Sequence, residues 1–164
     1  MPTSEESSAP SELTIKRTPI RFNETQAILT AISEHLEGDL ITYWNNPRGT
    51  VCHSDVIALY DLLSTRGGGK RVNLFIKSDG GNGQASLRMV SLLREYYEHV
   101  VALVPLECAS AATMLALGAD EIHMGPMAYL TSVDTSLTHD LSPIDRDNDR
   151  VSVSLDELKR VIHL

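Results

Sequence analysis

Apolar segments that suit buried strands alternate along this chain with segments that carry a helical stripe. Residues 71–78 and 99–105 are short runs with apolar side chains on both faces, as in buried parallel strands. Between them, Met89, Leu92 and Leu93 recur at the three- and four-residue spacing of a helix. This alternation predicts an α/β fold with a mostly parallel sheet and right-handed crossovers.

The same patterns predict the other elements of the chain. Further helices are expected over residues 23–38, from a Ser54 N-cap to Gly67, and over residues 109–119. Further short strands are expected over residues 39–44, 121–124 and 128–133. Residues 135–153 are polar and without periodicity, which predicts a loop, and a capping box at residues 154–157 predicts a last helix.

The first residues differ in composition from the rest of the chain. Residues 1–19 are rich in serine, proline and glutamate and predict a disordered tail. Residues 20–164 suit a single domain with a sizeable core. Because the last predicted helix has no stop signal, we expect this domain to be truncated at its C-terminus and the chain to be part of a longer protein.

Charge and cysteine content exclude several function classes. A net charge of −8 argues against nucleic acid and against an anionic membrane surface as partner. No apolar run approaches the ~20 residues that span a bilayer, so no membrane segment is predicted. Cys52 and Cys108 are too far apart in sequence for a metal motif, the histidines lack ligand spacing, and the compartment is expected to be reducing. We therefore predict a cytoplasmic protein without metal or cofactor.

The glycine-rich stretch FIKSDGGNGQAS, residues 75–86, resembles a phosphate-binding loop only at first sight. A dinucleotide fingerprint needs a third glycine after Gly83, and a P-loop needs Gly-Lys-Ser/Thr, so neither motif is present. Taken alone, the stretch predicts a strand-to-helix turn in which Gly80 and Gly81 supply positive φ angles.

A second strand-to-helix turn, CASAAT, spans residues 108–113. Ser110 stands at the predicted helix start, where amides and the helix dipole favour negative charge, although most serines at such places only cap helices. Cys108 is better explained as a small buried filler than as a nucleophile. Since parallel strands bring both turns to one sheet edge, Gly80 and Gly81 would offer amides to an oxyanion formed by attack of Ser110.

Residues 72–126, with Gly-Gly after one strand and Ser-Ala-Ala-Thr and Ala-Asp-Glu-Ile after the next, resemble the Clp protease/crotonase superfamily. The branch that they resemble most is the signal-peptide-peptidase-like one of the serine dehydrogenase proteinases, over roughly residues 39–134. The resemblance implies a spiral of ββα units, a homo-oligomer and a peptide or protein substrate. It also implies an acyl-enzyme on Ser110, with oxyanion amides from Gly80, Gly81 and Ala111.

The resemblance leaves the general base open. Clp-type peptidases have a histidine a couple of dozen residues after the serine, where this chain has none, and His139 is the nearest candidate. Signal-peptide-peptidase-like enzymes use a lysine, for which Lys159 is the alternative, but its acidic neighbours oppose deprotonation. We rank His139 first. The third triad member is Asp134, Asp140, Asp145 or an acid beyond the last residue.

Two other functions remain open at this point. A catalytically inactive scaffold or oligomerisation domain is suggested by the missing histidine in residues 130–136. A crotonase-like acyl-CoA enzyme would use the same amides to hold a thioester oxygen, and the serine in the nucleophile position argues against it.

Overall fold

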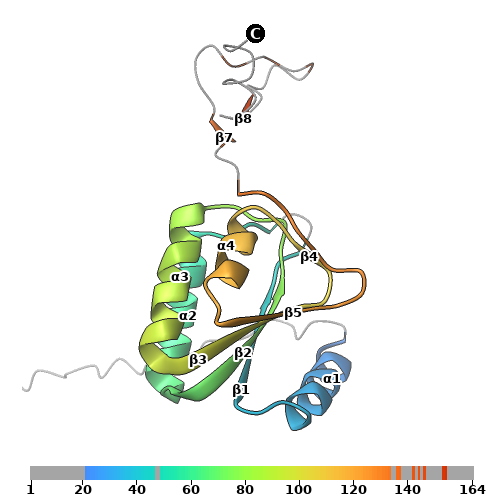
Figure 1. Cartoon of the computed structure of the whole chain (residues 1–164), viewed down its shortest axis with the longest axis vertical. Helices are drawn as coiled ribbons and strands as arrows, with labels where there is room; N and C mark the ends of the chain where they lie inside the picture. Colours follow the sequence, from blue (N-terminus) through green and yellow to red (C-terminus); the bar gives the residue numbers. More distant parts are fainter. Residues whose placement is uncertain are drawn as a thin grey trace, which may run out of the picture. The chain divides into compact units, whose positions relative to one another are not determined.

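The structure, a computed structural model, divides the chain into two units, Met1–His35 and Leu36–Leu164 (Figure 1). It describes residues 21–46, 49–133, 136, 137, 142, 144, 146, 153 and 154. In the first unit the described element is α1 (Phe22–Glu34), a helix with no buried residue. The predicted helix in this segment is confirmed, whereas the division into a tail and a single domain stays a prediction.

The second unit is built on a parallel four-stranded sheet. Its strands lie in the order β1 (Asp39–Trp44), β2 (Gly69–Lys77), β3 (Tyr97–Val104) and β5 (Glu121–Met124). Every neighbouring pair is parallel. The predicted α/β class with a mostly parallel sheet is confirmed, because each crossover between these strands contains a helix.

Three helices cover one face of this sheet (Figure 1). They are α2 (His53–Arg66), α3 (Gly83–Tyr96) and α4 (Ala111–Leu117). The core between the layers takes alternate residues of the two central strands and apolar residues of the helices. Its members include Val72, Leu74, Ile76, Val100, Ala102, Val104, Leu63, Met89, Leu93 and Leu115.

Two short strand pairs complete the described part of this unit. β4 (Glu107–Cys108) pairs in parallel with β6 (Tyr129–Leu130), and β7 (Ser136–Leu137) pairs antiparallel with β8 (Val153–Ser154). The predicted strand over residues 128–133 is thus shorter than expected, and the predicted loop over 135–153 contains β7. Ser154, which the sequence predicts as the cap of a last helix, lies in β8. Residues 155–164 lie outside the described residues.

The start of α2 also differs from the prediction. Its N-cap is Cys52 and not Ser54, which lies inside the helix. Asp55 explains the shift, because its carboxylate accepts the Cys52 N–H at 2.9 Å and the Tyr43 hydroxyl at 2.8 Å. The acidic residue at the third helical position therefore fixes the helix start two residues earlier.

In the part of the chain that the structure describes, none of the helices has the length and apolar character needed to cross a membrane.

Candidate functional site

The turn after β2 brings its two glycines against two other segments. Gly80 has φ +105, and a Cβ there would meet Ala109 O and Ser110 Cβ, each at 2.8 Å. Gly81 has φ +144, and a Cβ there would meet the backbone N and O of Val51 at 2.5 Å. Both positions therefore require glycine for the conformation and for the close approach.

Backbone hydrogen bonds join this turn to the turn before α4. Ser78 N–H donates to Glu107 O at 3.1 Å, and Ala109 N–H donates to Ser78 O at 2.9 Å. Ser78 and Cys108 thereby form a parallel bridge. The two turns that the sequence predicted at one sheet edge do lie side by side, as the contact between Gly80 and Ser110 requires.

Ser110 has an unusual backbone conformation. Its φ is +49 and its ψ −118, and among the described residues other than glycine it alone has a positive φ. Glycine normally occupies this region, so a serine there is strained. Ser110 stands at the N-cap position of α4, yet its side chain makes no cap hydrogen bond. The alternative that Ser110 serves as a simple helix cap is therefore contradicted.

Two threonines hold the strained turn. Ser110 N–H donates to Thr131 Oγ1 at 2.8 Å, and Thr131 N–H donates to Thr113 Oγ1 at 3.3 Å. Thr113, which is buried, donates its hydroxyl hydrogen to Cys108 O at 2.8 Å. These bonds connect β6 and α4 around Ser110, so the segment after β6 fixes the direction of the serine backbone. Sequence reasoning missed Thr131, because no spacing rule marks it.

The amides around Ser110 are not equivalent. Gly80 N–H donates to Ser78 Oγ at 3.2 Å, so this amide is already engaged. Among the hydrogen bonds of the described residues, neither Gly81 N–H nor Ala111 N–H has an acceptor. Gly81 and Ala111 are therefore the donors that this arrangement leaves for a ligand oxygen, and the Ala111 amide, at the start of α4, also favours negative charge.

Lys77, three residues before Gly80, is held away from proton transfer. Its Nζ lies 2.7 Å from Glu107 Oε1, and this hydrogen bond raises the pKa of the lysine. An ammonium group in such a pair stays protonated near neutral pH and does not act as a base. Cys108 is fully buried, and burial raises its pKa to about 12, which confirms it as a buried filler.

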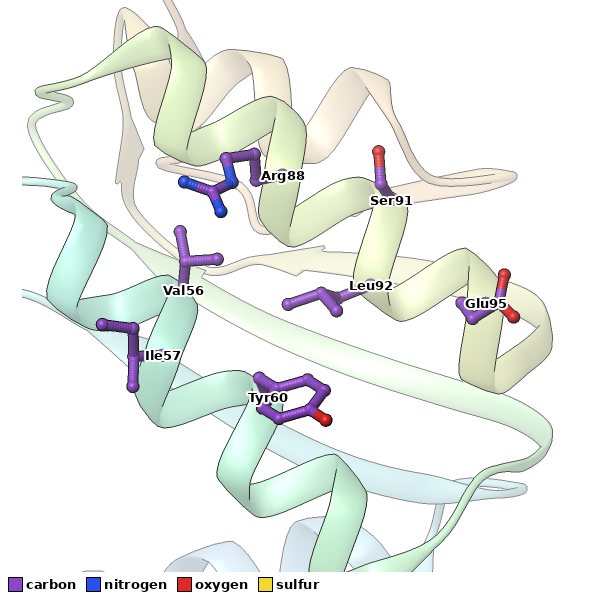
Figure 2. Close-up of a pocket in the computed structure, with 7 residues that line it drawn as sticks. All are labelled: Val56, Ile57, Tyr60, Arg88, Ser91, Leu92 and Glu95. Atoms are coloured by element: carbon purple, nitrogen blue, oxygen red, sulfur yellow. The ribbon is translucent and has the colours of Figure 1, made fainter.

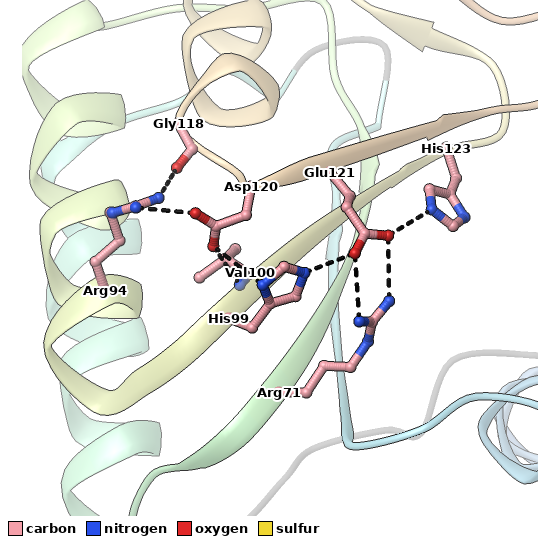
Figure 3. A network of polar contacts seen from close by, with 8 residues as sticks. All are labelled: Arg71, Arg94, His99, Val100, Gly118, Asp120, Glu121 and His123. Carbon is pink, nitrogen blue, oxygen red and sulfur yellow. Dashed lines mark hydrogen bonds and ion pairs between the residues drawn. The ribbon is translucent and has the colours of Figure 1, made fainter.

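Two of the histidines belong to a different cluster, shown in Figure 3. His99 Nε2 lies 2.7 Å from Glu121 Oε1, and His123 Nε2 lies 3.0 Å from Glu121 Oε2. The Arg71 guanidinium contacts both oxygens of the same carboxylate at 3.4 and 3.5 Å. These contacts lower the pKa of Glu121 to about 2, and the hydrogen bond with His99 has the largest effect. The group is an ion-pair network, and within the described ranges no set of three or more His, Cys, Asp or Glu side chains is placed to hold a metal.

The predicted bases and acids all follow Val133 in the sequence. His139, Lys159, Asp134, Asp140 and Asp145 all lie outside the described residues. In the described part of the chain, the Ser110 hydroxyl forms no hydrogen bond.

Comparisons with known proteins bear on the fold. The chain matches no protein-family model, and a search of curated proteins finds no match. A solved structure of the membrane-bound stomatin-specific protease 1510-N, with one serine replaced by alanine, is 16% identical with a TM-score of 0.51. The match covers 77% of this chain and 61% of that one, so this chain spans about three fifths of the length of its neighbour. The two chains share a fold.

A second solved structure is a mutant of ClpP1 from Listeria monocytogenes. It is 15% identical, with a TM-score of 0.47, and the match covers 85% of this chain and 69% of that one. At 16% identity, the likeness to the stomatin-specific protease concerns the fold alone. The stomatin-specific protease shows that a protease also has the α/β fold predicted here.

Proposed function

We propose that this chain is a serine hydrolase that cleaves peptide bonds through an acyl-enzyme on Ser110. The single observation that carries the proposal is the Ser110 turn: a strained serine, without a cap bond, beside two unengaged amides. Strain at such a turn is the way in which hydrolases expose a nucleophilic hydroxyl, and it persists only where the surroundings enforce it.

The proposed reaction follows from these atoms. Ser110 Oγ attacks the substrate carbonyl carbon, its proton passes to a base, and the carbonyl oxygen becomes an oxyanion. The Gly81 and Ala111 amides would stabilise that oxyanion, with Gly80 joining them when it leaves Ser78. The base would then give its proton to the leaving amine, and water would release the acyl group. We propose His139 as this base and Lys159 as the alternative.

The finer assignments are also proposals. The motifs around Gly80 and Ser110 support the signal-peptide-peptidase-like branch, with a peptide or protein substrate and a homo-oligomeric assembly. We also propose a reducing compartment, the cytoplasm, because two cysteines this far apart in sequence do not suggest a disulfide framework.

The test is labelling with a fluorophosphonate probe, read by mass spectrometry. We expect the probe on Ser110, no labelling of Ser110→Ala, and full labelling of Ser33→Ala, whose serine lies on α1. Unchanged labelling of Ser110→Ala would contradict the proposal.

Two further variants test the base. If His139 is the base, His139→Ala should lower the labelling rate about 100-fold or more, while Lys159→Ala keeps it, and the reverse pattern would assign Lys159. Because a free histidine titrates near pH ~6.5, a His139 base also predicts labelling that rises through that pH. If the folded wild-type chain takes no label, the inactive scaffold is favoured.

A further inference from the structure

A groove runs between α2 and α3 on the outer side of the helical layer, with a volume of about 520 Å³ (Figure 2). α2 lines it with Val56, Ile57 and Tyr60, and α3 with Arg88, Ser91, Leu92 and Glu95. Ile57 is 63% exposed and Tyr60 51% exposed. Two large side chains at the mouth of the groove are thus mainly exposed.

The α3 wall of the groove is a single stripe of the helix. Arg88, Ser91, Leu92 and Glu95 stand at positions i, i+3, i+4 and i+7, which share one helix face. We call these four residues the α3 stripe. Leu92 points into the groove toward Tyr60, and the two charged residues stand near its two ends (Figure 2).

The charges at the ends of the stripe have no partners in the described part of the chain. No ion pair involves Arg88 or Glu95, whereas the adjacent Arg94 is paired with Asp120 at 3.0 Å. A positive and a negative group are thus held apart at opposite ends of an apolar centre, and both are free to bind.

The order of these residues makes the stripe complementary to itself. Its midpoint lies between Ser91 and Leu92, and Arg88 and Glu95 are equally far from it, about 5 Å along the axis at 1.5 Å per residue. A two-fold axis through this midpoint, perpendicular to the helix, places Arg88 of one copy opposite Glu95 of the other. The small Ser91 at the centre lets the two helices approach closely.

We propose that a second copy of this chain occupies the groove, with the two α3 helices antiparallel and related by a two-fold axis. Each Leu92 would pack against α3 and Tyr60 of the other copy, and two Arg88–Glu95 ion pairs would close the ends. This inference rests on the homo-oligomeric assembly proposed above, but it does not depend on the chemistry at Ser110. It names the face through which copies of the chain associate.

Sedimentation velocity of the full chain, over a range of concentrations, tests the proposal through charge reversal. The wild type should dimerise. Arg88→Glu and Glu95→Arg should each raise the dimer dissociation constant at least about tenfold, because each places like charges opposite one another. Arg146→Glu, an exposed reversal outside the groove, should leave the constant unchanged.

Two recombinations make the test specific for the antiparallel pairing. The double variant Arg88→Glu/Glu95→Arg restores opposite charges and should dimerise like the wild type. An equimolar mixture of the two single variants should form a heterodimer, since each end then has one positive and one negative group.

Circular dichroism melting confirms that each variant is folded before its result is counted. A wild type that stays monomeric at every concentration would overturn the proposal. This includes the case in which another segment of the same chain covers the groove. If none of the charge reversals weakens the dimer, the dimer interface lies on another face, and this result would also overturn the proposal. A larger assembly supports the proposal only if both single reversals break it down.

Discussion

The two ends of helix α4 are built in opposite ways. At its carboxyl end, Gly118 N–H donates to Met114 O at 3.0 Å, and Arg94 donates to Gly118 O at 2.8 Å. At its amino end, Ser110 makes no cap bond and Ala111 N–H has no acceptor among the described residues. The carboxyl end satisfies these polar groups, whereas the amino end leaves the Ala111 N–H and the Ser110 hydroxyl without a partner among the described residues, although unpaired groups cost stability.

The saturated end continues into the network of Figure 3. Asp120 Oδ1 accepts from Arg94 at 3.0 Å, and Asp120 Oδ2 accepts the Val100 N–H at 2.8 Å. The next residue, Glu121, is shared by His99, His123 and Arg71. Both ends of α4 contain residue types suited to catalysis, and they differ in whether their polar groups have partners. Groups that are fully hydrogen-bonded or ion-paired stabilise the fold, whereas groups without a partner are available to a substrate.

The largest expected effect comes from adding a side chain at Gly80, which lies against the amino end of α4. Gly80→Ala should lower the free energy of unfolding by about 3 kcal/mol or more and abolish labelling of Ser110, because the new Cβ meets Ser110 and is strained at φ +105. Chemical denaturation measures the first effect. The matched control is Gly67→Ala, where φ is +80 and ψ 176 but no atom lies within 4 Å, so only the backbone strain of about 1–3 kcal/mol applies.

A smaller effect is expected at Thr131, which bonds to the backbone at the amino end of α4. Thr131→Val removes the acceptor of the Ser110 N–H and should reduce the labelling rate about tenfold, with a loss of about 1 kcal/mol in stability. Thr131→Ser keeps the hydroxyl and should restore the rate. Equal rates for the valine variant and the wild type would show that the Ser110 backbone is held without this bond.

Ser110→Gly should change stability in the opposite direction. Glycine tolerates φ +49, so relief of strain outweighs the added freedom of the unfolded chain, and the protein should gain up to about 1 kcal/mol. Labelling should be lost at the same time. A Ser110→Gly variant that is less stable than Ser110→Ala would show that the turn is not strained.

The smallest effect is expected in the network at the carboxyl end of α4, and it depends on pH. Glu121 has its pKa lowered from 4.5 to about 2, so its charged contacts stabilise the fold above pH 4.5 and are lost as the pH falls toward 2. The denaturation midpoint of Glu121→Gln should therefore fall less over this range than that of the wild type. Labelling at Ser110, measured at neutral pH, should be the same in both proteins.

Local patterns predicted the fold where the signal is contained in neighbouring residues. The strand Asp39–Trp44 has the bounds expected from its β-rich sequence, and the parallel sheet follows from the alternation of strands and helices. Contacts between distant residues were not predictable. The start of α2 depends on Asp55 bonding to Cys52 and Tyr43, and β7 pairs with β8 across sixteen positions, which no local pattern encodes.

The candidate site divides in the same way. The sequence placed Ser110 at a helix start next to Gly80 and Gly81, because parallel strands end at one edge. The positive φ of Ser110 is not marked by any local pattern, and Thr131, which bonds to its N–H, lies 21 residues away in the sequence. Sequence spacing also gave no reason to separate the engaged Gly80 amide from those of Gly81 and Ala111, since Ser78 Oγ decides that difference.

The positive φ of Ser110 has a consequence for descent. One base change converts some serine codons to glycine, and that change would yield a more stable chain that lacks the proposed nucleophile. Selection for stability would therefore favour glycine at this position in any lineage that does not use the hydroxyl. Among relatives of this chain, serine here would mark those still under selection for chemistry, and glycine those retained for their architecture.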